Sequence, residues 1–512
     1  MFRDSLIAVL GARFLVLAIR SITPLCILYC CLIWMRYSPI KHWFPFILGI
    51  YASLETAFFF LVYVPRYLYL QQTTTQAPPS GRLQERQALF QKCIDTIPDP
   101  ERFISLWNRG TPVEKIHREN LKEWVCWAFL NKGSWTVAED DELEEYVCRL
   151  ENLLGYRLPE GKGSSKSMRV FLDWVNMLHR PLIYYVGGVG LLDITTYFRM
   201  RYQGYRHYTV SSWFLSFPFR PQTTLSKHRS PSKHFSYWYR PHTSPDTLPI
   251  LFIHGMGILF SYQSFFNDFS KFTKEPNNDG IGLIAIETLP ISFRMSHPAL
   301  LHEDICTEIL SILDHHGWNK FVLTSASYGT AISSQLLRDN RIAPRIGPMI
   351  LVDPIPFLLH LPDTTYNFTR RKPRSVTEIF LHYFASTDMG AAHTLCRRFF
   401  WNECILWKED LMNCGRRTTV VFSERDMVID AHAIGEYLTR NSNLTAIEDR
   451  GREDGEWKSR WWTGGELDIL WFEGIDHGEI LNAPIDRKIL IEVVLNYCRG
   501  ESTPVTRRDA VE

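Results

Sequence analysis

The chain has 512 residues with a formal net charge of +1, and 46% of its residues are hydrophobic against 22% charged. This length allows about three domains, and the composition excludes wholesale disorder. The near-zero net charge excludes the basic footprint of a nucleic-acid-binding protein, and the 11 cysteines form no C-x-x-C pair, so we expect reduced, packed cysteines and no structural zinc site.

Two apolar segments stand near the start of the chain. Residues 14–34 and 43–63 are each 21 residues long, and each contains one charge, Arg20 and Glu55 respectively. About 20 apolar residues suffice to cross the bilayer core as a helix, and aromatic residues flank these segments where the membrane interfaces would lie. We predict a transmembrane hairpin with a short loop at 35–42, and leave open the alternative of one span and one interfacial helix.

The charges inside these segments require an explanation. An arginine near the centre of a span costs roughly 2.5–3.5 kcal/mol. A partner of opposite charge in the other span would lower this cost. We therefore hypothesise that Arg20 pairs with Glu55 across the hairpin.

A polar linker at 71–81 leads into a region of helical patterns that extends to about residue 200. Thr136 and Glu139 form a capping-box pattern before an amphipathic helix. Residues 182–198 are again apolar, but three glycines and Asp193 interrupt them, and the stretch is short for a membrane span. We interpret this stretch as a core or membrane-surface segment.

From about residue 205 short apolar strands alternate with helices, which is typical of an α/β protein. The strands are nearly continuous apolar runs, as expected of parallel strands buried on both faces. We predict a mostly parallel central sheet. Its strands are expected at 234–241, 249–254, 282–289, 320–326, 348–353, 418–423 and 467–472, with helices at 300–315, 328–338 and 489–498.

The strand at 320–326 runs directly through Ser327 into a helix. A serine on such a sharp turn presents its hydroxyl above the sheet at a helix N-terminus. Small residues are needed two positions before and after it, because the turn brings backbone segments close together. Gly329 meets this need, and Ser325 stands where the G-x-S-x-G pattern has its first glycine. Ser327 is therefore the candidate nucleophile.

A glycine turn follows the strand at 249–254, in the sequence His254, Gly255, Met256 and Gly257. Such a turn can aim a backbone N–H at the carbonyl oxygen of a bound ester. We assign the two donors of an oxyanion hole to the backbone N–H groups of Met256 and Tyr328. His254 is expected to support the turn by hydrogen bonding, and we do not make it the catalytic base.

Two further candidates follow late strands: Asp426 after 418–423 and His477 after 467–472. The chain order Ser, Asp, His is the order found in strand–turn–helix hydrolases of this pattern. We predict that His477 takes the proton of Ser327. Asp426 would fix the tautomer of the imidazole and stabilise its charged form.

The choice of acid has competitors. Asp353 also ends a strand and is the alternative acid. Asp430 and Asp476 are weaker competitors, because the first is expected to face solvent and the second adjoins the histidine in sequence. The His315-His316 pair is interpreted as a helix C-terminal feature, so no metal and no cofactor are expected.

With these motifs in this order, residues 246–499 resemble the α/β-hydrolase family, and most of all its lipase, esterase and lysophospholipase-like branch. The resemblance implies a mostly parallel sheet, a serine nucleophile that works through an acyl-enzyme, and no cofactor. It also implies a cap inserted at about 354–417. In this chain that stretch is rich in Phe, Leu, Trp and Tyr, which would suit an acyl chain.

These predictions divide the chain into a transmembrane hairpin at 1–75, a helical region at 76–204, an α/β-hydrolase domain at 205–500 and a tail at 501–512. They describe a membrane-anchored serine hydrolase of a carboxylic ester, with a glycerolipid or lysophospholipid as the expected substrate. A non-catalytic scaffold or lipid-binding protein, and an acyltransferase that uses the same serine, stay open as alternatives. The sequence does not name the organelle, although an endomembrane such as the endoplasmic reticulum would fit.

Overall fold

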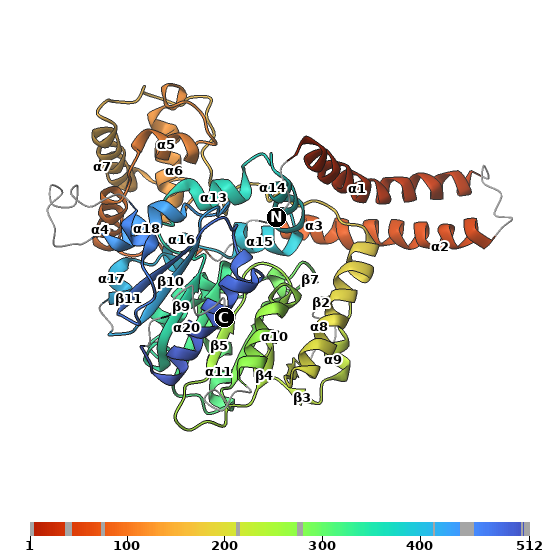
Figure 1. The fold of residues 1–512 in the computed structure, drawn as a ribbon. Coiled ribbons are helices and arrows are strands. Elements are labelled where there is room, and N and C mark those ends of the chain that lie inside the picture. The colour runs from red at the N-terminus through yellow and green to blue at the C-terminus, as the bar shows by residue number, and fades with distance from the viewer. Residues whose placement is uncertain are drawn as a thin grey trace.

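A computed structural model of the protein describes residues 5–35, 43–72, 77–210, 216–273, 280–412, 415–440, 455–502 and 505. Most of the predicted hairpin loop at 35–42 and of the predicted tail at 501–512 lies outside these residues. A twisted sheet covered by helices forms the body, and two long helices project from it (Figure 1).

The central sheet has nine strands in the order β11-β10-β9-β8-β5-β6-β4-β1-β3. Neighbours from β11 to β6 are parallel, whereas β4 is antiparallel to both β6 and β1. Two short strands, β2 and β7, pair separately. The strands are β1 Arg206–Thr209, β2 Ser216–Phe217, β3 His228–Arg229, β4 Ser236–Arg240, β5 Ile250–Ile253, β6 Leu283–Glu287, β7 Met295–Ser296, β8 Phe321–Ala326, β9 Ile346–Val352, β10 Thr418–Ser423 and β11 Leu467–Phe472.

Helices cover both faces of this sheet because alternate side chains of each strand point to opposite faces. Ile250 and Phe252 of β5 pack into the core under α10 (Gln263–Phe272) and α20 (Pro484–Arg499). Leu251 and Ile253 pack into the opposite core. That core contains side chains of α11 (His302–His315), α12 (Tyr328–Arg338) and α18 (Ala431–Thr439). This architecture is the α/β-hydrolase fold, and the predicted fold class is confirmed.

The strands predicted at 418–423 and 467–472 have the predicted bounds, as does the helix predicted at 328–338. β1 was not predicted as a strand. Its sequence, Arg-His-Tyr-Thr, lacks an apolar run, and three of its four residues are nevertheless buried. His207 is held there by a hydrogen bond between its Nε2 and Glu287 Oε2 at 2.9 Å. Tertiary polar contacts, which no local pattern reveals, make this segment a strand.

The helical region before the sheet shares its core with the sheet. Thr136 and Glu139 form the predicted capping box, in which the Thr136 N–H donates to Glu139 Oε2 at 3.0 Å. The Trp107 indole N–H donates to the carbonyl of His360 at 3.1 Å, and Trp401 donates to Ala128 at 2.9 Å. The region is thereby tied to the segment between β9 and β10. Its helices are α4 Leu83–Asp95, α5 Pro100–Trp107, η2 Val113–Lys115, α6 Arg118–Leu130 and α7 Val137–Leu154.

The stretch at 354–417, predicted as a cap, is largely helical. Its helices are α13 Pro362–Thr369, α14 Val376–Phe380, the π-helical turn η9 Leu381–Ser386, α15 Met389–Arg397, α16 Trp401–Cys404 and α17 Lys408–Met412. The remaining helices are η3 Tyr184–Val189, α8 Gly190–Tyr202, α9 Pro221–Leu225, η5 Leu259–Tyr262, η7 Leu289–Ile291, η8 Ala343–Arg345, η10 Glu456–Ser459 and η11 Glu479–Leu481.

The two projecting helices are the predicted apolar segments. α1 runs Leu6–Trp34, and α2 (Trp43–Phe58) continues through η1 (Phe59–Tyr63) and α3 (Val64–Leu70). By length and composition, both Leu6–Trp34 and Trp43–Leu70 suffice to cross a membrane. Figure 1 shows α1 and α2 side by side, extending away from the sheet.

The hypothesis that Arg20 pairs with Glu55 is wrong. Arg20 is exposed, whereas Glu55 is fully buried at the inner end of the hairpin. The Glu55 carboxylate accepts hydrogen bonds from the Thr23 hydroxyl and from the Leu182 N–H at 2.6 Å, and His179 Nε2 lies 3.3 Å from it. Glu55 therefore joins the hairpin to the body and does not neutralise the charge of Arg20 in the other helix.

Candidate active site

Ser327 lies on the sharp turn between β8 and α12, at the centre of the sheet's C-terminal edge. Its φ of 49° and ψ of −123° are rare for a residue with a side chain. The turn is held because the Ser327 N–H donates to the Val352 carbonyl of the neighbouring strand at 2.9 Å. Backbone strain of this kind persists only where the surroundings impose it, and it is concentrated at functional sites.

The small residues around this turn are required by close backbone contacts. A Cβ on Gly329 would lie 2.3 Å from the Ile253 carbonyl oxygen, and a Cβ on Gly255 would lie 2.7 Å from the Ser327 Cβ. Ser325, which replaces the first glycine of the pattern, is fully buried and accepts a hydrogen bond from the Ser333 hydroxyl at 2.8 Å. Serine is thus accommodated at a position where the pattern has glycine.

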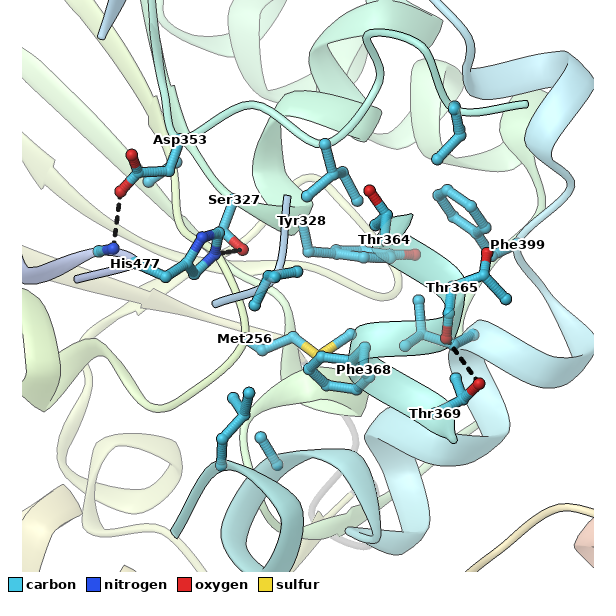
Figure 2. Close-up of a pocket in the computed structure, with 18 of the residues that line it drawn as sticks. Met256, Ser327, Tyr328, Asp353, Thr364, Thr365, Phe368, Thr369, Phe399 and His477 are labelled. Atoms are coloured by element: carbon cyan, nitrogen blue, oxygen red, sulfur yellow. Dashed lines mark hydrogen bonds between the residues drawn. The ribbon is translucent and has the colours of Figure 1, made fainter. Parts of the chain in front are cut away.

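His477 reaches Ser327 from the loop after β11. Its Nε2 lies 2.7 Å from the Ser327 Oγ, and its Nδ1 lies 2.6 Å from Asp426 Oδ2. Figure 2 shows the imidazole turned toward the serine hydroxyl. The structure therefore brings together the three side chains that we predicted as nucleophile, base and acid, from the ends of three different strands.

The loop after β10 fixes the orientation of Asp426. Its other oxygen, Oδ1, accepts backbone N–H bonds from Val428 at 2.7 Å and Ile429 at 3.0 Å. The ionised carboxylate is an acceptor only, so the proton between it and His477 belongs to Nδ1. Nε2 is then free to accept the proton of the Ser327 hydroxyl.

The electrostatics of the site favour a charged imidazole. Burial lowers the pKa of His477, but the charge of Asp426 and its hydrogen bond outweigh burial and raise the pKa to about 9. The negative charges of Asp353 and Asp476 act in the same direction. The site thus stabilises the imidazolium that forms when His477 accepts a proton.

The three competing aspartates have other partners. Asp353 accepts hydrogen bonds from the Ser423 N–H at 2.9 Å and the Gly478 N–H at 2.6 Å, and burial together with the Asp426 charge raises its pKa to about 6. Asp430 caps α18. Asp476 accepts the backbone N–H of His477, not its imidazole, at 2.7 Å. Of these carboxylates, Asp426 is the one hydrogen-bonded to the imidazole.

The glycine turn after β5 lies beside the nucleophile. Met256 and Tyr328 both line the cavity that contains the Ser327 hydroxyl. Within the part of the chain that the structure describes, neither backbone N–H has a hydrogen-bond partner, so both remain available as donors. His254 is fully buried: its Nε2 accepts from the Thr288 N–H at 3.0 Å, and its Nδ1 lies 2.6 Å from the Gly255 carbonyl oxygen. Burial lowers the pKa of His254 to about 4, consistent with a neutral ring that supports the turn.

The cavity above Ser327 has a volume of about 370 Å³ and is mostly apolar. Figure 2 shows Ser327 and His477 at one side of it, with Thr364, Thr365 and Phe399 at the other. The walls include Phe368, Phe380, Leu381, Phe384 and Phe399 from the stretch at 354–417, and Trp107, Trp127, Val170 and Phe171 from the helical region. Sequence reasoning missed the second group, because no local motif indicates that a segment so far before the nucleophile covers it.

Asp353, Asp426 and His477 also form the kind of cluster that could hold a metal, with ligand atoms within 4.8 Å of one another. Their oxygen and nitrogen atoms already have the hydrogen-bond partners given above. A metal ion would have to break the contact between His477 and Asp426. The residues thus fit a proton-transfer chain better than a metal site.

The histidine pair noted in the sequence lies elsewhere, at the C-terminal end of α11. The Nε2 of His316 lies 2.9 Å from the Tyr237 hydroxyl.

No protein-family model matches the chain, and no curated protein sequence does. Among solved structures, naproxen esterase from Bacillus subtilis is 13% identical, with a TM-score of 0.36, and the match covers 60% of this chain and 98% of that one. A membrane phospholipase A described as a bacterial virulence factor is 12% identical, with a TM-score of 0.37, over 62% of this chain and 94% of that one. Carboxylesterase CesB from Bacillus subtilis is 11% identical, with a TM-score of 0.36, and the match covers 60% of this chain and 99% of that one. At these values the matches assign neither activity nor substrate to this chain.

Proposed function

We propose that the protein is a serine hydrolase that cleaves a carboxylic ester through an acyl-enzyme. One observation carries the proposal: an unbroken hydrogen-bonded chain runs from the Ser327 hydroxyl through both nitrogens of His477 to Asp426. A nucleophile, a base and a group that orients the base, all within hydrogen-bond distance, form the constellation of covalent hydrolases.

In the first half of the reaction, Ser327 Oγ attacks the ester carbonyl carbon while its proton passes to His477 Nε2. The imidazolium then gives this proton to the leaving alkoxide, and the alcohol departs from an acyl-serine. In the second half, a water molecule is deprotonated by the same nitrogen and attacks the acyl carbon. The carboxylic acid leaves, and Ser327 regains its proton from His477. Asp426 remains ionised throughout and keeps the Nδ1 proton in place.

The negative oxygen that forms in each half is assigned to the backbone N–H groups of Met256 and Tyr328. Tyr328 is the first residue of α12, where the N–H groups and the helix dipole favour negative charge. Removing one such donor from a comparable site costs roughly 2.7–4 kcal/mol of transition-state stabilisation. Two donors therefore account for a large part of the expected rate enhancement.

We further propose that the substrate is a membrane lipid and that the hairpin anchors the protein in a bilayer. The cavity is lined by aromatic and aliphatic side chains, which suit a hydrocarbon chain. Phe380 lines this cavity and also packs in the cluster formed by α1 and α14. A single layer of side chains thus separates the cavity from a candidate membrane helix, which favours a substrate that arrives from the bilayer.

The test is covalent labelling of the full chain by a fluorophosphonate probe. We expect wild type to be labelled and Ser327→Ala to be unlabelled, because the probe reacts with an activated serine hydroxyl. Ser325→Ala is the matched control: this serine is two residues away but bonded to Ser333 and absent from the cavity wall. Labelling that persists in Ser327→Ala would disprove the proposal. If wild type is not labelled, the alternative of a non-catalytic protein is favoured. In a separate assay with an ester substrate and an added alcohol, formation of a new ester would indicate acyl transfer.

A further inference from the structure

The helix formed by η3 and α8 exposes a row of large apolar side chains, which a helix of a water-soluble protein would bury. Its large exposed apolar side chains are those of Ile183, Val186, Leu191, Ile194, Phe198 and Tyr202, of which Leu191 is 60% exposed and Phe198 62%. The step of five residues from Val186 to Leu191 crosses the π-helical turn, so that all six side chains follow one side of the helix. We call these six residues the α8 apolar face.

The opposite side of α8 is buried, and among Gly190, Thr196 and Met200 it carries one charged residue, Asp193. Asp193 is 4% exposed, and it accepts two hydrogen bonds from the Arg294 guanidinium, at 2.6 and 3.0 Å. Arg220 lies 3.6 Å from the same carboxylate and also bonds Glu287. Because buried charges are tolerated when they are paired, this network fixes the rotation of the helix. The apolar face therefore cannot turn inward to escape water.

The first turns of this helix pack against the hairpin. The helix begins where the Leu182 N–H bonds Glu55 of α2, and the Tyr185 ring packs on the Phe58 ring with a centroid distance of 5.7 Å. In Figure 1, α8 starts beside the inner end of α2 and runs transverse to the hairpin. A helix that lies across the inner end of membrane-spanning helices lies along the bilayer surface.

The far end of α8 is basic. Arg199 and Arg201 are exposed in its last turn, and the single acidic residue of this helix is the buried Asp193. Phe198, Arg199 and Tyr202 line an open groove of about 460 Å³ together with polar side chains of α10. An apolar face with arginines at its edge matches the boundary between acyl chains and anionic headgroups.

We propose that α8 lies in the membrane interface, with its apolar face among the upper acyl chains and Arg199 and Arg201 on anionic phospholipid headgroups. This inference rests on the proposed membrane anchoring by the hairpin, but not on the proposed ester hydrolysis. It gives the body a fixed orientation on the bilayer. The cap and its cavity wall are then held at the lipid surface, beside the inner end of α1.

The experiment uses the full chain reconstituted in phosphatidylcholine vesicles, with and without phosphatidylglycerol. An environment-sensitive fluorescent amino acid replaces Phe198, Leu28 of the hairpin or Val137, an apolar residue 92% exposed on α7, in three separate proteins. Quenching by lipids brominated on their acyl chains is compared with quenching by aqueous iodide. We expect lipid quenching at Phe198 and Leu28, and iodide quenching alone at Val137. Phosphatidylglycerol should strengthen lipid quenching at Phe198, and the double variant Arg199→Gln/Arg201→Gln should lose that increase.

The outcomes separate this inference from the anchoring itself. Lipid quenching at Leu28, with Phe198 quenched only by iodide, overturns the interfacial position of α8 and leaves the anchor. Lipid quenching at Phe198 but not at Leu28 supports α8 and contradicts the hairpin. A Phe198 probe shielded from both quenchers shows that protein covers this face, which also overturns the inference, and exposure of all three probes to iodide alone overturns both proposals.

Discussion

The carboxylate of Asp353 accepts a hydrogen bond from the backbone N–H of Gly478 across 2.6 Å, and so holds the residue that follows His477. Asp426 holds the ring of the same histidine from another loop. Asp353 therefore acts on the histidine loop through the backbone of Gly478 and Asp426 acts through the imidazole, while Asp476 accepts the N–H of His477 itself. Amide substitutions separate their roles, because only Asp426 is bonded to Nδ1.

We expect Asp353→Asn to affect stability more than chemistry. An amide has one acceptor oxygen, so its NH₂ group must face either the Ser423 N–H or the Gly478 N–H. A buried donor without a partner lowers the free energy of unfolding by about 1–3 kcal/mol, and the shifted histidine loop lowers kcat by up to about 10²-fold. Denaturant unfolding and single-turnover kinetics measure the two effects. A loss of kcat as large as that of Asp426→Asn would instead make Asp353 the acid.

The activity should rise with pH. Only neutral His477 can accept the serine proton, and its pKa is raised from 6.5 to about 9, so the competent form accumulates as the pH increases through that range. Removing the charge of Asp426 in Asp426→Asn should move the inflection of kcat/KM to lower pH. It should also reduce kcat by roughly 10⁴-fold, because the amide stabilises the wrong tautomer. Stopped-flow measurement of ester cleavage from about pH 5 to about pH 10, in steps of about one unit, covers the inflections expected for both proteins. A wild-type inflection at or below 6.5 would contradict this assignment.

The backbone contacts at the turn give a third prediction. In Gly329→Ala the new Cβ would lie 2.3 Å from the Ile253 carbonyl oxygen, so α12 must move and carry Ser327 away from His477. We expect fluorophosphonate labelling to be lost and stability to fall by about 1–3 kcal/mol, as in other overpacked sites. Gly188→Ala is the control, because a Cβ there meets no atom within 4 Å. Normal labelling of Gly329→Ala would show that the turn tolerates a side chain.

The order of motifs along the chain made much of this site predictable. Ser327, Asp426 and His477 each follow an apolar strand, and the carboxyl ends of parallel strands meet at one edge of a sheet. Their spatial approach therefore follows from strand identification alone. The same rule could not choose between Asp426 and Asp353, since both follow strands. The choice depends on which loop turns toward Nδ1, and that is decided by backbone bonds such as those from Val428 and Ile429.

Contacts between distant segments were not predictable. Helix length and hydropathy indicated the hairpin, but they do not indicate which residues contact one another. Glu55 contacts His179 and Leu182 and does not pair with Arg20. Likewise, Trp107 lines the cavity although it lies far from Ser327 in sequence. Packing of whole elements decides these pairings, and a single sequence carries no local signal for it.

The acyl-chain preference should depend on Trp127. This residue lines the cavity, whereas Trp124, one turn earlier on α6, does not. Both side chains are buried, and neither indole N–H has a hydrogen-bond partner among the described residues, so the two form a matched pair. Trp127→Phe removes volume at the wall of the cavity and should shift the preferred chain toward longer acyl groups.

Trp124→Phe removes the same volume from the neighbouring core. It should lower the stability of the protein and leave the acyl-chain preference unchanged. Large-to-small core substitutions cost on the order of 1–3 kcal/mol depending on how well the site collapses. The measurement is kcat/KM for p-nitrophenyl esters of increasing chain length, with thermal unfolding of both variants alongside. If the two variants show the same chain-length profile, Trp127 does not contact the acyl chain. A shift confined to Trp127→Phe would show that a segment before the sheet sets the length of chain that the cavity accepts.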